Sequence, residues 1–193
     1  PRFYDVTGGS ITVDGKDIRG LTLKSLRSQI GMVQQDVYLF CGSIRENIAY
    51  GKPDATMEEI EDAAKKAKAY NFIQEKENGF DTQISRFDNK YSGGEMQRIA
   101  IARMILKRPE ILIMDEATSG IDVISEHEVM EALMNLMAGK TVIMVSHDME
   151  MIRRADNLIV LNGGQVEASG DFHQVAAASP LFQAFLDKGG YLV

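Results

Sequence analysis

Two acidic residues, Asp115 and Glu116, directly follow the apolar run ILIM at 111–114. Such a run is typical of a strand buried on both faces of a parallel sheet, and ligands of these sheets bind at the carboxyl ends of the strands. At that edge Asp115 can hold Mg²⁺ through its water shell, and Glu116 can orient or deprotonate an attacking water. The alternative is a strand that ends in a solvated acidic loop. Two acids after so apolar a run are uncommon, which favours a functional site.

Polar residues also end two other predicted strands. VSHD at 145–148 ends one of them, so His147 is expected on the same sheet edge as Glu116. A lone histidine is more often structural, but the matching position favours a ligand contact. MVQQD at 32–36 supplies Gln34 and Gln35, whose amide oxygens can ligate a hard cation. Turn formation explains these two glutamines equally well.

The stretch YSGGEMQR at 91–98 combines two glycines with a predicted helix start. Free N–H groups at a helix start suit an anion, and adjacent glycines allow close approach of the backbone. Ser92, Gly93, Gly94 and Glu95 also match the S-x-x-E capping box, which accounts for the serine and the glutamate without a ligand. The capping box does not account for the two glycines.

A phosphate loop of the form G-x-x-x-x-G-K-[ST] is missing from the 193 residues. The only Gly-Lys-Thr begins at Gly139, but Met134 stands where the first glycine is needed, and a predicted strand follows instead of a helix. Gly15-Lys16 and Gly51-Lys52 are followed by the wrong residues. The acids therefore stand without the loop that usually accompanies them.

Patterns along the chain predict an α/β fold. Segments 30–36, 110–117 and 140–148 have the pattern of strands, the last two of buried strands, and 123–137 has that of a helix between two of them, which implies a parallel sheet. Thr56 and Glu59 mark a helix start, and Asn162-Gly163-Gly164 marks a hairpin turn. The predicted parts are an α/β core (1–42 and 109–170), a helical subdomain (43–108) and a C-terminal helical tail (171–193).

Composition narrows the function classes. A net charge of −7 and a pI near 5.0 argue against a nucleic-acid partner. The single cysteine, Cys41, excludes an internal disulfide and is expected to be a buried or half-buried filler. No apolar run approaches the roughly 18 residues of a spanning helix. The start lacks both a methionine and the pattern of a signal peptide, which indicates a processed chain or a fragment.

Together these motifs resemble the nucleotide-binding domain of ATP-binding-cassette (ABC) transporters of the exporter type. YSGGEMQR looks like the signature motif, usually LSGGQ followed shortly by QR, and ILIMDE looks like the Walker B strand with its catalytic glutamate. SGID resembles the D-loop, ending at Asp122, and SHD the switch-histidine loop, while Gln35 matches the Q-loop glutamine. LFCGSIRENIAYG at 39–51 is similar to the exporter segment that faces the membrane domains. The resemblance implies a P-loop NTPase-type (RecA-like) parallel sheet with an inserted helical subdomain.

The chain also departs from the family pattern. Residues 2–15 resemble the segment that follows the Walker A helix, so the chain is expected to be truncated just after its phosphate loop. Where exporters usually read roughly VGExG, this sequence has ISRFDNK, with Ser85 and Arg86, which reverses the charge there. Tyr91 replaces the usual leucine and Glu95 the usual glutamine of the signature motif.

The resemblance implies an ATP-binding and ATP-hydrolysing motor that powers export through head-to-tail dimerisation. Glu116 and His147 would be catalytic, and Gln35 and Asp115 would bind Mg²⁺. The implied ligands are ATP and Mg²⁺, and the implied partners are a second ABC ATPase domain, identical or different, and an exporter's transmembrane domain. The expected place is the cytoplasmic face of a membrane, although the fragment itself is expected to be soluble and inactive alone. Two alternatives stay open, a non-transport ABC ATPase and a non-catalytic subunit that completes another chain's ATP site. The residues expected to contact nucleotide are Gln35, Asp115, Ser92, Gly93, Gly94, Glu95 and Asp122.

Overall fold

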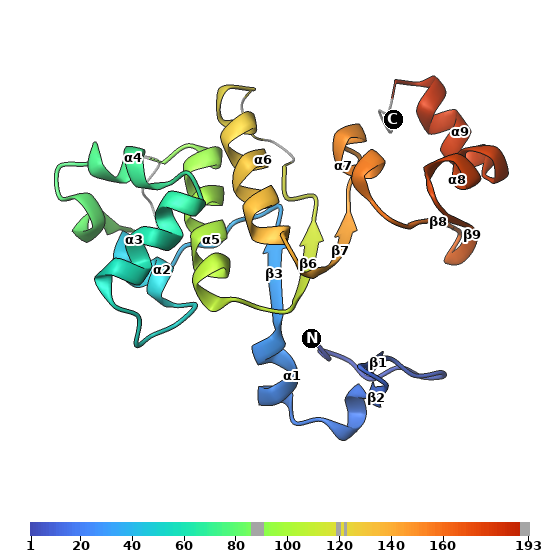
Figure 1. The fold of residues 1–193 in the computed structure, drawn as a ribbon, viewed down its shortest axis with the longest axis horizontal. Coiled ribbons are helices and arrows are strands. Elements are labelled where there is room, and N and C mark those ends of the chain that lie inside the picture. The colour runs from blue at the N-terminus through green and yellow to red at the C-terminus, as the bar shows by residue number, and fades with distance from the viewer. Residues whose placement is uncertain (86–90, 119–120, 122, 190–193) are drawn as a thin grey trace. The chain divides into compact units, whose positions relative to one another are not determined.

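The structure is a computed structural model that describes residues 1–85, 91–118, 121 and 123–189. The chain falls into two compact units, Pro1–Met144 and Val145–Val193. Figure 1 shows the order of the elements along the chain. The division into core, helical subdomain and tail, with boundaries at 42, 108 and 170, stays a prediction.

A three-stranded sheet with the order β3-β6-β7 carries the predicted strand ends. β3 (Ile30–Gln34) and β6 (Ile111–Asp115) are parallel, with Gln34 opposite Asp115. β7 (Thr141–Val145) lies beside β6. The parallel pairing confirms the predicted α/β class and brings the carboxyl ends of β3 and β6 to one edge.

The two apolar strands differ in how far they are buried. In β6, Leu112 and Met114 are buried, while Ile111 and Ile113 are half-buried. The prediction that β7 is a buried strand is wrong for one of its faces, since Ile143 and Val145 are each 58% exposed. An apolar run indicates that a strand favours a buried position. How far its side chains are actually exposed depends on which elements cover the strand.

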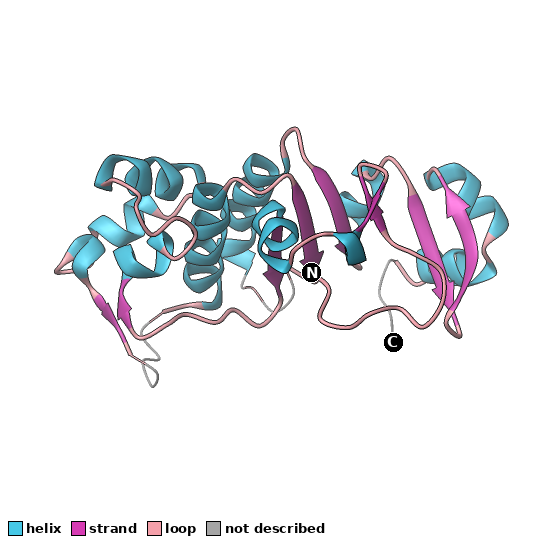
Figure 2. Ribbon diagram, turned by 90° about the horizontal axis from the view of Figure 1, so that it is seen from below, coloured by secondary structure: helices cyan, strands magenta, loops and turns pink. Residues whose placement is uncertain are grey.

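Helices dominate the segment between β3 and β6, as the sequence predicted (Figures 1 and 2). Their starts follow local signals, because Ser43 with Glu46 and Thr56 with Glu59 both form capping boxes. α5 packs against α2, α3, α6 and β3, so it forms the centre of this region. The helices are α2 (Ile44–Ala49), α3 (Met57–Lys66), α4 (Tyr70–Gln74) and α5 (Gly93–Lys107), with the 3-10 turn η2 (Gly79–Asp81) and the short antiparallel strands β4 (Gly42–Ser43) and β5 (Gln83–Ile84).

The segment before β3 contains a short hairpin. β1 (Thr12–Val13) and β2 (Lys16–Asp17) pair antiparallel around Asp14 and Gly15, which both have positive φ, 48° and 74°. The 3-10 turn η1 (Ile18–Gly20) and α1 (Leu23–Gln29) follow. Cys41, further along, is exposed and not the buried filler that was expected.

After β6, helix α6 (Val123–Met137) has the bounds that the sequence predicted. It buries Val129, Ala132, Leu133 and Leu136, which recur at helical spacing. This buried face explains why the apolar pattern of 123–137 predicted the helix correctly.

The second unit has its own small core, formed by Ile152, Val175, Phe182 and Phe185. Its hairpin turns at Gly163 and Gly164, whose φ values of 56° and 79° suit glycine. The predicted helical tail is two helices, because Ser179 ends the first and caps the second. The elements are α7 (Met149–Arg154), β8 (Leu158–Asn162), β9 (Gln165–Gly170), α8 (Phe172–Ala178) and α9 (Pro180–Asp187).

Candidate functional site

The carboxyl ends of β3 and β6 bring three of the predicted residues to one edge of the sheet. Because Gln34 is opposite Asp115 in the parallel register, Gln35 and Glu116 each follow by one residue on neighbouring strands. Gln35 and Asp115 are exposed, and Glu116 is half-buried. The edge therefore presents one amide and two carboxyl groups, as the sequence predicted.

Glu116 has an unusual backbone conformation. Its φ is 45°, in the left-handed region that costs a residue with a side chain roughly 1–2 kcal/mol. Such a conformation persists only where the surrounding structure holds it. The chain turns sharply at Glu116 as it leaves β6, and the next residue shows what holds that turn.

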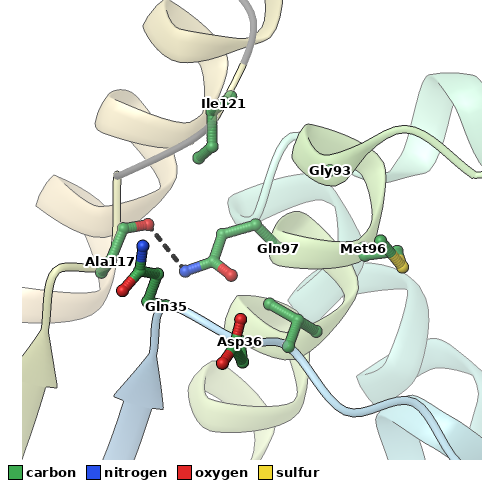
Figure 3. Close-up of a pocket in the computed structure, with 8 residues that line it drawn as sticks. Gln35, Asp36, Gly93, Met96, Gln97, Ala117 and Ile121 are labelled. Atoms are coloured by element: carbon green, nitrogen blue, oxygen red, sulfur yellow. Dashed lines mark hydrogen bonds between the residues drawn. The ribbon is translucent and has the colours of Figure 1, made fainter.

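Ala117 is fixed by a side chain from α5. The Nε2 atom of Gln97 donates a hydrogen bond of 2.7 Å to the Ala117 carbonyl oxygen, and this bond is buried (Figure 3). Gln97 is 2% exposed, so its amide is committed to this contact. The bond ties helix α5 directly to the backbone that follows Glu116.

Gln97 also lines a pocket of about 330 Å³ at this edge (Figure 3). The pocket is enclosed by the end of β3, the first turns of α5 and the loop after β6. It joins Gln35 to the signature segment within one cavity. Its lining residues are Gln35, Asp36, Val37, Gly93, Met96, Gln97, Ala117 and Ile121.

The start of α5 contains the predicted capping box. Ser92 caps the helix, its backbone N–H donating to Glu95 Oε2 at 2.9 Å and its Oγ accepting from the Glu95 N–H at 3.1 Å. Ser92 and Gly93 are nevertheless exposed. The capping box therefore organises a helix start whose outer face is open to solvent.

Gly94 has a packing role that the sequence did not reveal. It is buried, and a Cβ at this position would lie 2.3 Å from the Cβ of Ser125 on α6. Glycine therefore permits close approach of α5 to α6. Gly93 faces the pocket while Gly94 faces a neighbouring helix, so the two glycines serve different purposes.

Arg98 joins α5 to its neighbours from a buried position. It forms an ion pair with Glu128 of α6, and its guanidinium lies 5.0 Å from the centre of the Phe72 ring on α4. The motifs in the sequence predicted no role for Gln97 or Arg98, although both belong to the QR of the signature stretch. Both polar side chains directly precede the apolar run IAIA at 99–102, which is the signal that could have identified them.

Two of the predicted site residues, His147 and Asp122, lie outside the described part of the first unit. His147 is exposed, in the loop between β7 and α7, and belongs to the second unit, so its place beside Glu116 stays a prediction. Asp122 lies outside the described residues, as does Arg86. The other two histidines, His127 and His173, are exposed.

The donor set at the edge fits a hard divalent cation. Gln35 and Asp115 offer oxygen atoms, which Mg²⁺ prefers, and the exposure of both side chains leaves room for the waters or phosphate oxygens that Mg²⁺ usually keeps. Within the described part of the chain, no cluster of three or more His, Cys, Asp or Glu side chains could hold a metal alone. A cation here would take water molecules or phosphate oxygens as its further ligands.

Comparison with known proteins places this site in a family. Residues 2–119 match the family model of the ABC transporter, so this chain belongs to the ABC transporter family. The ATP-dependent lipid A-core flippase of Syntrophus aciditrophicus (strain SB) is 49% identical over 170 residues, which are 88% of this chain and 28% of the flippase. ABC transporter B family member 19 of Arabidopsis thaliana is 47% identical over 185 residues, 96% of this chain and 15% of that protein.

A solved structure agrees in fold. A bacterial Atm1-family ABC exporter with ATP bound superposes with a TM-score of 0.88 at 36% identity, over 99% of this chain and 33% of the exporter chain. This similarity confirms the predicted ABC-type P-loop NTPase fold. The chain spans about a third or less of the length of each of these relatives. Among the residues that the structure describes, none of the helices is both long and apolar enough to cross a membrane.

Proposed function

We propose that this chain acts as the ATP-binding and ATP-hydrolysing motor domain of an ABC exporter. The observation that carries the proposal is the shared sheet edge, where Gln35, Asp115 and Glu116 end neighbouring strands. The pocket that contains Gln35 also contains Gly93 of the signature helix. The relatives with the same motifs include an ATP-dependent flippase and an ATP-bound exporter, which supports the same class of activity here.

Each residue at this edge has a chemical role in hydrolysis. Glu116 orients the attacking water and accepts its proton, and its strained backbone, held through Ala117, fixes the direction of the carboxylate. Asp115 and Gln35 would hold Mg²⁺, and the bound cation would supply neutralisation of the phosphate charge. His147 contacts the γ-phosphate. Positioning and charge neutralisation of this kind supply most of the catalysis of phosphoryl transfer.

The signature residues serve a second subunit. In a head-to-tail dimer of ABC domains, Ser92 and the backbone N–H groups of Gly93 and Gly94 face the γ-phosphate of a nucleotide held by the partner's phosphate loop, with Glu95 and Asp122 completing the nucleotide site. The exposed capped start of α5 suits this role, because its N–H groups and the helix dipole favour a phosphate. Nucleotide shared between subunits would couple binding to dimer closure.

An exposed aromatic surface supports a membrane-domain partner. We use this name for Tyr38, Phe40 and Tyr50, which are all exposed. The ring of Phe40 contacts the rings of both tyrosines. Arg103 of α5 lies over the rings of Phe40 and Tyr50, and donates to the backbone oxygens of Tyr38 and Asn47. Clustered exposed aromatic residues with an arginine are typical of protein interfaces. Docking of a transmembrane domain here would hold the chain at the cytoplasmic face of a membrane.

The proposal is tested by replacing Glu116 with glutamine in a purified full-length exporter that contains this chain. The amide keeps the size of the side chain but cannot accept the proton of the water. Steady-state ATP hydrolysis should fall by at least about 100-fold, the lower range for a general base, while MgATP still binds. Undiminished hydrolysis by this variant would refute the role of Glu116. Purification without any membrane domain would refute the exporter assignment and favour a non-transport ATPase.

A further inference from the structure

Glu95 places a negative charge at the helix start that, under the proposed function, faces a phosphate. A carboxylate in the first turn stabilises a helix through the dipole, but it repels a second anion at the same place. One oxygen of Glu95 is used by the capping box, where it accepts the Ser92 N–H. The partner of the other oxygen determines how strongly the charge of Glu95 would repel a phosphate.

Lys76 contacts that second oxygen. Its Nζ lies 2.9 Å from Glu95 Oε1, and the two side chains are 27% and 17% exposed. By comparison, the side chains of Lys66 and Asp62 form a similarly close ion pair on α3 but are 55% and 52% exposed. The charge of Glu95 is therefore paired in a partly buried setting, in which solvent screens it less than at the surface.

Lys76 also contacts the other departure from the usual signature motif. Its Nζ lies 5.1 Å from the centre of the Tyr91 ring and 5.7 Å from that of Phe72, within the range of a cation–π contact. Tyr91 and Glu95 stand where the family usually has leucine and glutamine. Lys76 therefore contacts both unusual residues, although it lies 19 residues before Glu95 in the sequence.

We propose that Lys76 is a positioning residue for the nucleotide-facing start of α5. It neutralises Glu95 and holds this carboxylate in the capping box, so that Ser92 and Gly93 can receive the phosphate of a nucleotide bound by the partner subunit. Lys76 itself touches no nucleotide in this account. The inference rests on the proposed function and extends it to a residue outside the signature motif.

The test is a double-mutant cycle in the full-length exporter, with KM for MgATP and kcat measured for each variant. Lys76→Gln should raise KM about fivefold, which corresponds to about 1 kcal/mol, and should leave kcat within twofold. Lys76→Arg should stay close to the wild type, because the guanidinium keeps the charge. In a Glu95→Gln background, Lys76→Gln should change KM by less than twofold, since glutamine still closes the capping box but carries no charge.

Lys66→Gln is the matched control, because it removes a similar ion pair far more exposed to solvent, and its KM should stay within twofold of the wild type. A thermal melt of each variant identifies any loss of folding. An equal effect of Lys76→Gln in both backgrounds, with or without a lower melting temperature, would mean a purely structural role and would overturn the inference. So would an unchanged KM in an active exporter. A wild type without ATP hydrolysis would overturn the proposed function and this inference with it.

Discussion

The hydrogen bond between Gln97 and Ala117 gives a sharp test of how the structure holds the loop after Glu116, to which the proposal assigns catalysis. In Gln97→Met the side chain keeps nearly the same volume, so the cavity cost is small. The variant leaves the buried Ala117 oxygen without its donor, which costs about 1–3 kcal/mol. The middle of this range, about 2 kcal/mol, corresponds to roughly 30-fold in the stability of the loop conformation. We therefore expect kcat to fall about tenfold, with 30-fold as the upper limit.

The assay is steady-state ATP hydrolysis by the full-length exporter at saturating MgATP, with a binding titration alongside. Binding should change little, because Gln97 acts on the loop after Glu116 and not on the phosphates. The matched control is Gln83→Met, since Gln83 also donates to a backbone carbonyl, that of Asp81, but at an exposed site. That control should stay within twofold of the wild type. If Gln97→Met keeps a normal kcat, the buried bond does not position Glu116 and the argument is refuted.

Two further predictions concern packing and acid stability. Gly94→Ala should destabilise the protein by about 1–3 kcal/mol, because the new Cβ would lie 2.3 Å from the Cβ of Ser125 and must push α5 away from α6. Thermal denaturation measures this loss. The control is Gly20→Ala, which should match the wild type because a Cβ at Gly20 would have nothing within 4 Å. The hydrogen bonds from the side chain and backbone of Arg19 lower the pKa of Asp17 from 3.8 to about 2. The stability that this pair contributes is therefore present above pH 3.8 and lost as the pH falls through about 2. A carboxyl titration of Asp17 by NMR with a midpoint near 4 would contradict the pairing.

Local sequence signals predicted most elements of the fold. The bounds of α6 follow from the spacing of its apolar residues, and capping boxes at Ser43, Thr56 and Ser92 begin three of the helices. Each of these signals involves residues within a few positions of one another, so the sequence contains the whole interaction. The shared edge of Gln35 and Glu116 was predictable for a different reason, since parallel strands align their carboxyl ends.

Contacts between distant residues could not be predicted in this way. Gln97 and Ala117 are 20 positions apart, and nothing local in either residue indicates the partner. The exposure of Ile143 on β7 likewise depends on which elements cover the strand, not on its own apolar pattern. Sequence patterns therefore identified the edge of the site but missed the side chains that fix its geometry.

Helix α5 connects two surfaces that the proposal assigns to different partners. Its first turn carries the capped start at Ser92, and Arg103, about 15 Å further along the axis, anchors the segment behind the aromatic surface. The helix runs unbroken between these points, and after Gly94 it contains no proline, glycine or serine, the residues that commonly kink a helix. A tilt imposed at the end near Ser92 would therefore displace Tyr38 and Asn47 at the other. The size of this displacement would depend on the length of α5 and on the angle of its tilt.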